Sequence, residues 1–394
     1  MSRTRLLLFV TIVAWFVACG GLASAQTAQV DYERLDQRLT RMAEDPAVVG
    51  LAVAVIEGGE IKFAEGYGVT RLGGDAVTAD TVFRWASLSK GVASTAIGKM
   101  VAEGELSLSD TIAKFQTSLR LPMGGEKVGT LEDLLAHKIG IVPNAYDTRL
   151  EDGGDPSEIR KALGKLKRTC PVGDCHTYQN VAFDAISEVV ASVRGISFEE
   201  VVAIELFEPL GMRDASFGLE ALRDSLSWAE PHRKRRSDAK PVRRTVNQSY
   251  YRVPAAGGVN GSILDLARFA LAQMGEQPDV LSADTLTELH APRIYTRREQ
   301  SSMSRRFGGH LRDARYALGW RVYKYGAPGY RVVGHRGAVD GYRSLILFDP
   351  ARKSGVVALW NSNARNPVGV QFEVMDMIYG LEAKDWMQLD TDRG

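Results

Sequence analysis

The sequence predicts an α+β fold in which an antiparallel sheet flanked by helices carries a large all-helical insertion. β-branched apolar runs lie near both ends of the chain, whereas helical periodicity dominates its middle. A polar turn at 349–355 joins the last two apolar runs, so these two strands are expected to be antiparallel neighbours. We therefore expect residues 26–90 and 305–384 to form the sheet region, 91–304 the helical region and 385–394 a polar tail.

Periodicity and end signals predict the individual elements. Leu35, Leu39 and Met42 have near-helical spacing, which indicates an amphipathic helix that ends near residue 44. The other expected elements are a hairpin over 49–55 and 61–64, helices over 87–103 and 178–193, capping boxes at Thr130 and Ser262, strands over 318–323, 330–333, 344–348 and 356–360, and a closing helix with Asn366 as N-cap, Pro367 first and Gly380 past its end.

The composition is that of an ordinary globular protein. Of 394 residues, 45% are hydrophobic and 25% charged, which argues against a disordered or fibrous chain. The 49 Lys and Arg against 48 Asp and Glu give a formal net charge of +1, so no overall positive field favours nucleic acid. A basic run between Arg233 and Arg244 lacks interleaved aromatic residues and is expected to be a solvated loop.

The first 25 residues have the pattern of a secretory signal. Two arginines precede an apolar run that ends at Val17, and Ala-Ser-Ala at 23–25 has the small-x-small form of a cleavage site. We therefore expect residues 1–25 to be removed and the protein to be exported to the periplasm. The alternative is a lipid anchor on Cys19, which ends a lipobox-like segment; otherwise we expect no membrane attachment after signal removal.

Two further cysteines enclose a turn-rich stretch. Cys170 and Cys175 flank Pro-Val-Gly-Asp, and an oxidising compartment would let them form a small disulfide loop. Two cysteines alone make a poor zinc site, and the sequence contains no His-x-His or His-Glu-x-x-His. We therefore expect a disulfide here and no metal.

The strongest local signal for chemistry is Ser87-Leu-Ser-Lys90. Positions i and i+3 at the start of a helix share a face, so the Ser87 hydroxyl can meet the Lys90 amine. A serine hydroxyl is a weak nucleophile that needs a neighbour able to take its proton. Alone, this spacing is common by chance, and the alternative is a solvated helix start that Ser87 caps.

Two other motifs follow in a meaningful order. Tyr178-Gln-Asn180 precedes a predicted helix, and His335-Arg-Gly337 ends an apolar run. Together with Ser87-x-x-Lys90, they resemble the serine β-lactamase and penicillin-binding-protein superfamily, most closely its branch of class C β-lactamases, D-alanyl-D-alanine carboxypeptidases and related esterases. The similarity extends from about Tyr32 to about Leu381.

The resemblance implies roles for the motif residues. Ser87 is the acylated nucleophile, Lys90 accepts or relays its proton, Tyr178 acts with Lys90 as general base or acid, and Asn180 positions Lys90 and the substrate amide. His335 stands where many relatives have the Lys of Lys-Thr-Gly, Gly337 lets substrate approach the strand, and the Ala338 N–H joins that of Ser87 in an oxyanion hole. The structural alternatives are a buried loop aromatic for Tyr178, a helix N-cap for Asn180 and a strand histidine satisfied by a backbone carbonyl for His335.

Departures from the family pattern bear on the substrate. Ser-Asp-Asn is absent, and Lys353-Ser-Gly, although similar to the third motif, is expected in a surface turn. His335 makes the positive charge for a substrate carboxylate conditional on pH, which weakens the case for β-lactam hydrolysis. Arg336 could supply that charge only if strand alternation did not point it away from the site.

We therefore expect an exported serine hydrolase that forms an acyl-enzyme at Ser87 with an ester, amide or lactam and needs no cofactor. The expected partner is a small-molecule or peptide substrate. One alternative is a class C-like β-lactamase or a peptidoglycan D,D-carboxypeptidase. An alternative of another kind is a catalytically silent peptidoglycan-binding module.

Overall fold

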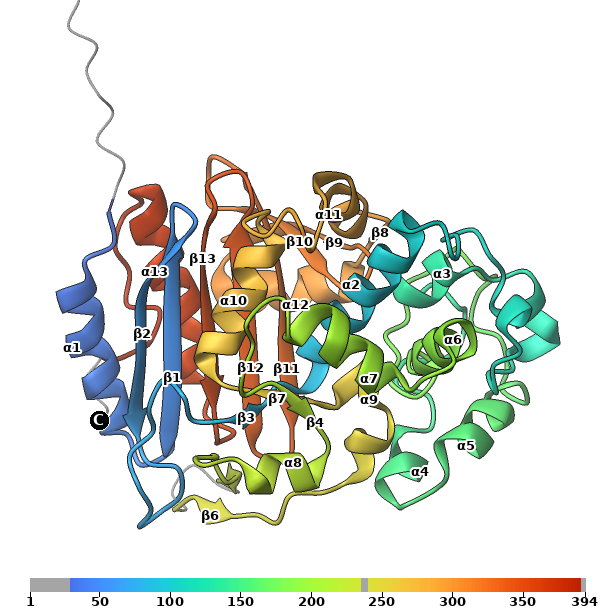
Figure 1. Cartoon of the computed structure of the whole chain (residues 1–394). Helices are drawn as coiled ribbons and strands as arrows, with labels where there is room; N and C mark the ends of the chain where they lie inside the picture. The colour runs from blue at the N-terminus through green and yellow to red at the C-terminus, as the bar shows by residue number, and fades with distance from the viewer. Residues whose placement is uncertain (1–28, 235–239, 391–394) are drawn as a thin grey trace, which may run out of the picture.

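An eight-stranded antiparallel sheet forms the centre of the computed structural model, which describes residues 29–234 and 240–390 (Figure 1). The strand order is β2-β1-β13-β12-β11-β10-β9-β8. β1 pairs with β13, with Leu51 opposite Trp360, so the two ends of the chain meet inside one sheet. The expected antiparallel sheet built from both ends is confirmed. The signal segment 1–25 and Cys19 lie outside the described residues.

The elements have the following bounds. The strands are β1 (Gly50–Glu57), β2 (Glu60–Gly68), β3 (Phe83–Arg84), β4 (Ser216–Phe217), β5 (His232–Arg233), β6 (Val242–Arg243), β7 (Val259–Gly261), β8 (Ile294–Tyr295), β9 (Leu311–Tyr316), β10 (Arg321–Tyr325), β11 (Tyr330–Val339), β12 (Tyr342–Asp349) and β13 (Ser354–Trp360). The α-helices are α1 (Tyr32–Ala43), α2 (Ser89–Ala102), α3 (Leu131–Leu135), α4 (Asp147–Glu151), α5 (Pro156–Leu163), α6 (Ala185–Arg194), α7 (Phe198–Val202), α8 (Leu219–Asp224), α9 (Pro254–Gly257), α10 (Ile263–Gln273), α11 (Ala283–His290), α12 (Arg297–Phe307) and α13 (Val370–Tyr379). Short helical turns are η1 (Ala86–Leu88), η2 (Ile112–Phe115), η3 (Pro122–Lys127), η4 (Ala203–Phe207), η5 (Ser249–Arg252) and η6 (Asn366–Gly369).

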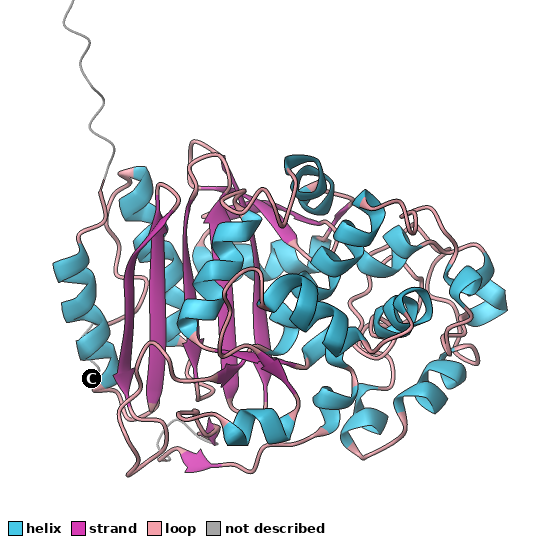
Figure 2. Ribbon diagram, viewed as in Figure 1, coloured by secondary structure: helices cyan, strands magenta, loops and turns pink. Residues whose placement is uncertain are grey.

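Both faces of the sheet are covered, because alternate residues of its central strands enter two different cores. On β1, Ala52 and Ala54 join the core that includes α2 and α10, whereas Val53 and Val55 join the core of α1 and α13. A strand covered on both faces is nearly continuously apolar, as β1 is from Gly50 to Ile56. Figure 2 shows the strands among helices, with a part made of helices and loops alone beside them.

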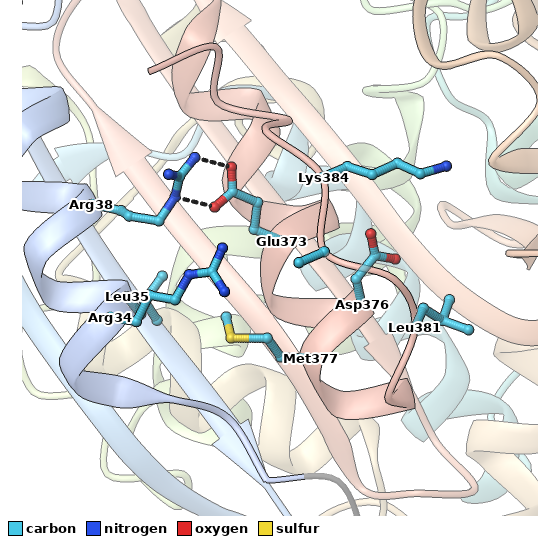
Figure 3. Close-up of a pocket in the computed structure, with 9 residues that line it drawn as sticks. Arg34, Leu35, Arg38, Glu373, Asp376, Met377, Leu381 and Lys384 are labelled. Atoms are coloured by element: carbon cyan, nitrogen blue, oxygen red, sulfur yellow. Dashed lines mark hydrogen bonds and ion pairs between the residues drawn. The ribbon is translucent and has the colours of Figure 1, made fainter. Parts of the chain in front are cut away.

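The face of the sheet that α1 and α13 cover is the outer face. On it, a cluster of ion pairs joins the two ends of the chain. Arg38 of α1 forms a fork-shaped pair with Glu373 of α13, with its Nε 2.6 Å from the carboxylate (Figure 3). Arg38 also pairs with Asp385 and Asp390. The adjoining cavity is only about 30 Å³. It is too small for a substrate, so this face has a structural role.

The segment after α13 differs from the expected polar tail. Over residues 385–390, Met387 and Leu389 are buried in the core that α1 and α13 share. Asp385 and Asp390 turn toward Arg38. The acidic composition of this segment predicts a polar tail and gives no sign that Met387 and Leu389 are buried.

Several boundaries also differ from expectation. The helix expected from residue 178 begins at Ala185, because residues 178–180 are bound to other parts of the chain. The strand expected to end at residue 333 runs to Val339, so His335 lies inside it. Asn366 begins a short 3-10 turn, and the closing α-helix starts only at Val370.

Other local predictions are confirmed. The hairpin, the capping boxes at Thr130 and Ser262, the left-handed cap at Gly380 and the Cys170–Cys175 disulfide are all present. α10 lies in the range assigned to the helical region but packs on β1 and β13. In the part of the chain that the structure covers, no helix is long and apolar enough to cross a bilayer, and no cluster of three potential metal ligands occurs.

Candidate active site

Ser87 lies in a turn that two other segments, β7 and β12, hold in place. Trp85, just before it, is buried, donates its backbone N–H to Val259 at 2.9 Å and accepts a 2.6 Å hydrogen bond from Ser344 Oγ. Ala86 has a left-handed backbone with φ of 50°, which turns the chain sharply into η1. Ser87 itself stays partly exposed, so its hydroxyl is accessible.

Lys90 is fully buried one helical turn later. Its Nζ donates to Asn180 Oδ1 at 2.8 Å and to the Ala256 carbonyl at 2.9 Å. These bonds occupy two of the three positions on the amine, which leaves the third for a hydroxyl of Ser87 or Tyr178. The nitrogen lies 4.8 Å from the centre of the Tyr178 ring. The predicted proton acceptor and phenol are therefore neighbours.

The Asn180 side chain is oriented by a residue that the sequence analysis missed. Its Nδ2 donates to Asp147 Oδ2 at 2.6 Å, and this bond turns Oδ1 toward Lys90. Burial raises the pKa of the Asp147 carboxyl. Asn180 is not an N-cap, because α6 starts after Asp184. No motif marks Asp147, which begins the short helix α4.

The Tyr178 hydroxyl is buried and has no hydrogen-bond partner among residues 29–234 and 240–390. The ring lies 6.2 Å from the His335 ring, and the Arg321 guanidinium lies 5.7 Å from its centre. A buried hydroxyl without a partner is costly.

Strand β11 presents an open edge to the Ser87 turn. Its pairing with β10 ends at Gly334, whereas its pairing with β12 continues to Val339. A Cβ on Gly337 would lie 2.4 Å from the Trp85 carbonyl oxygen, so only glycine lets the strand approach the turn this closely. Ala338 follows on the same edge.

His335 and Arg336 point to opposite faces of the sheet. His335 faces Tyr178, and its Nε2 lies 3.1 Å from Tyr316 Oη. Burial, reinforced by nearby positive charge, holds the pKa of His335 well below its usual range, so the ring is neutral. Arg336 contacts Met303 and Phe307 on the other face, as strand alternation predicts. Neither residue supplies a positive charge at the site.

The structure thus places Lys90, Tyr178, Asn180 and His335 around one point, with Ser87 one helical turn from Lys90 and Gly337 against the Ser87 turn. His335 Nδ1 also bonds a backbone carbonyl, that of Arg336 at 2.9 Å, as the structural alternative proposed. The site also includes four residues that belong to none of the three sequence motifs: His137, Asp147, Tyr316 and Arg321.

The fold and these side chains define a serine hydrolase of the β-lactamase-related class. The beta-lactamase family model matches residues 35–371, and the chain belongs to this family. The family expectation from the sequence motifs is therefore confirmed.

Individual relatives are distant but cover most of the chain. It is 27% identical over 348 residues to penicillin-binding protein 4 of Amycolatopsis lactamdurans, covering 84% of this chain and 85% of that one. It is 24% identical over 330 residues to an unguisins hydrolase of Aspergillus campestris, covering 80% of this chain but only 59% of that relative. The octameric penicillin-binding protein homologue of Pyrococcus abyssi has a TM-score of 0.78 at 25% identity, covering 90% of this chain and 78% of that one.

Proposed function

We propose that the protein is an exported hydrolase that cleaves an ester or amide through an acyl-enzyme on Ser87. The observation that carries the proposal is the anchoring of Lys90: two fixed acceptors hold its amine one helical turn from an accessible serine.

The reaction follows from this geometry. Ser87 Oγ attacks the substrate carbonyl while its proton passes to Lys90 or, through Lys90, to Tyr178. The N–H groups of Ser87 and Ala338 stabilise the oxyanion. The C–O or C–N bond breaks as the leaving group takes that proton, and water then attacks the acyl-enzyme, losing one proton to the same pair while Ser87 regains one.

The electrostatics favour substrates without a carboxylate beside the scissile bond. The His335 ring is neutral, and both of its nitrogens are already hydrogen-bonded within the protein. The Arg321 guanidinium, 5.7 Å from the centre of the Tyr178 ring, lies 3.8 Å from Glu299, whose negative charge offsets its own. We therefore propose that esters and amides without a carboxylate, including D-amino acid amides, are better substrates than β-lactams, which carry a carboxylate.

Covalent labelling tests the nucleophile. A fluorescent fluorophosphonate and a fluorescent penicillin are each incubated with the wild type and with Ser87→Ala. We expect fluorophosphonate to label the wild type and not the variant. A folded wild type that neither reagent labels and that cleaves no substrate would instead favour the silent binding module.

A substrate panel tests the specificity. We expect higher kcat/KM for p-nitrophenyl acetate and for D-alanine p-nitroanilide than for nitrocefin. The reverse order would favour the β-lactamase alternative.

The proposed export is tested separately, by fractionating cells that express the full chain, a chain lacking residues 1–25 or Cys19→Ala. Loss of protein from the periplasm on truncation supports a signal, and release from membranes in Cys19→Ala supports lipidation.

A further inference from the structure

Behind the catalytic residues, three buried side chains form an unbroken hydrogen-bond chain. Gln179 N lies 3.3 Å from His137 Nδ1, and His137 Nε2 lies 3.2 Å from Tyr316 Oη. Tyr316 Oη lies 3.1 Å from His335 Nε2, and His335 Nδ1 lies 2.9 Å from the Arg336 carbonyl oxygen. The rings of His137 and Tyr316 are inaccessible to solvent, so water does not compete for these bonds.

The two ends of the chain fix the position of every hydrogen in it. The Gln179 N–H can only donate, so His137 Nδ1 is the acceptor and Nε2 carries the hydrogen. The carbonyl at the other end can only accept, so His335 Nδ1 carries a hydrogen and Nε2 accepts from Tyr316. The two histidines are therefore opposite tautomers. Tyr316 accepts a hydrogen bond from His137 and donates one to His335.

Additional protons on the rings are disfavoured. Burial, as the largest cause, holds the pKa of both His137 and His335 well below the usual range. A proton on His335 Nε2 would also leave the Tyr316 O–H without an acceptor. The charged or titratable groups that surround the two rings are Lys90 from α2, His176 and Tyr178 from the loop before α6, Tyr316 from β9, Arg321 from β10 and Arg336 from β11.

The chain joins the two halves of the candidate site. Gln179 lies between Tyr178 and Asn180, and Arg336 directly precedes Gly337 on the open edge of β11. We infer that Tyr316 and His137 are positioning residues that fix His335 as the neutral Nδ1–H tautomer and set the distance between the Tyr178 loop and β11. This inference rests on the proposed function, because it assigns the distance a role in acyl transfer.

If Tyr316 acted only by packing its ring, loss of its hydroxyl would not change the kinetics. The rings of His137, Tyr178 and Tyr316 also contact one another, with 4.4 Å between the His137 and Tyr178 centres. Tyr316→Phe keeps the ring and removes only the hydroxyl. Tyr325→Phe is a matched control, because Tyr325 is a buried tyrosine of the same sheet whose hydroxyl bonds Asp376 in the core of α1 and α13.

Kinetics with p-nitrophenyl acetate test the positioning role. For Tyr316→Phe we expect kcat to fall about fivefold to tenfold, the equivalent of one lost hydrogen bond, with little change in KM. The pH profile of kcat/KM should gain an acidic limb, because His335 Nε2 loses its donor and becomes free to take a proton. Tyr325→Phe should change neither. Equal kinetics and pH profiles for the two variants would overturn the positioning role.

The tautomers provide a test that does not depend on activity. Two-dimensional ¹⁵N NMR of histidine-labelled wild type, with His137→Gln and His335→Gln for assignment, should show Nε2–H for His137 and Nδ1–H for His335. The same tautomer at both positions would refute the chain. Failure of fluorophosphonate to label Ser87, with these tautomers intact, would count against the proposed function alone.

Discussion

Gly337→Ala tests how closely β11 must approach the Ser87 turn. The added Cβ would lie 2.2 Å from Ser344 Oγ and 2.4 Å from the Trp85 carbonyl oxygen, whereas ordinary van der Waals contact begins at 3.4 Å. Ser344 can rotate only by giving up its bond to Trp85, and the carbonyl belongs to the buried turn itself. The strand or the turn must therefore move by about 1 Å.

The expected cost follows from that displacement. A misplacement of about 1 Å at a catalytic centre lowers the rate roughly 100-fold, or about 2.7 kcal/mol in activation free energy. Overpacking should also lower the free energy of unfolding by about 1–3 kcal/mol. Steady-state kinetics and urea unfolding measure the two effects. Gly257→Ala is the control, because its Cβ meets nothing closer than 3.4 Å. A Gly337→Ala enzyme within twofold of the wild type would refute the reasoning.

Three other predictions concern the Asp147 carboxylate, the Arg38 ion pairs and the buried His290. Asp147→Ala should lower kcat/KM about tenfold, because Asn180 loses the acceptor that orients it, and Asp147→Asn, which keeps an oxygen acceptor, should recover much of the loss. Equal kinetics for the two variants would contradict this. Arg38→Met should destabilise the fold by about 2–4 kcal/mol in urea unfolding, because Glu373 is left buried without its cation, while activity per folded molecule stays unchanged. An unchanged unfolding midpoint would argue against the ion pair. His290 is buried, which lowers its pKa to about 3, so its contribution to stability is complete above the ordinary value of 6.5 and is lost as pH falls from there toward 3. Unfolding measured between pH 4 and about 5.5, where the unfolded histidine is protonated and the folded one is not, should show a slope smaller by about 1.4 kcal/mol per pH unit in His290→Gln. An unchanged slope would exclude this residue as a source of acid lability.

Local signals predicted the parts of the fold that local forces determine. The hairpin turn at Gly58-Gly59 and the caps at Thr130 and Ser262 depend on residues within four positions, and each is present. The end of β11 depends on distant residues. Its apolar run stops at Val333, yet the strand continues, because Tyr316 satisfies His335 inside the core. A polar residue at the end of an apolar run therefore predicts the end of a strand correctly only when no distant residue hydrogen-bonds to it in the core.

The candidate site divides in the same way. Ser87, Lys90, Tyr178 and Asn180 belong to motifs whose spacing is visible in the sequence, and the structure brings the last three into contact. Tyr316 belongs to no such motif. It is 179 positions from His137, and only the meeting of the sheet with the helical region makes them partners. Side chains that act through another residue leave no local pattern to find.

The alternation of side chains along β11 explains why His335, in the position where many relatives have Lys, leaves this part of the site without a positive charge. A strand sends successive side chains to opposite faces, so the cationic Arg336 enters the core beside Met303 and the neutral His335 faces Tyr178. Shifting the register by one residue would exchange them, but it would also move Gly337 away from Trp85 and bring a side chain against the turn. The close approach of Gly337 to Trp85 therefore keeps Arg336 on the other face of the sheet. The proposed preference for substrates without a carboxylate therefore rests on the same contact that brings β11 against the Ser87 turn.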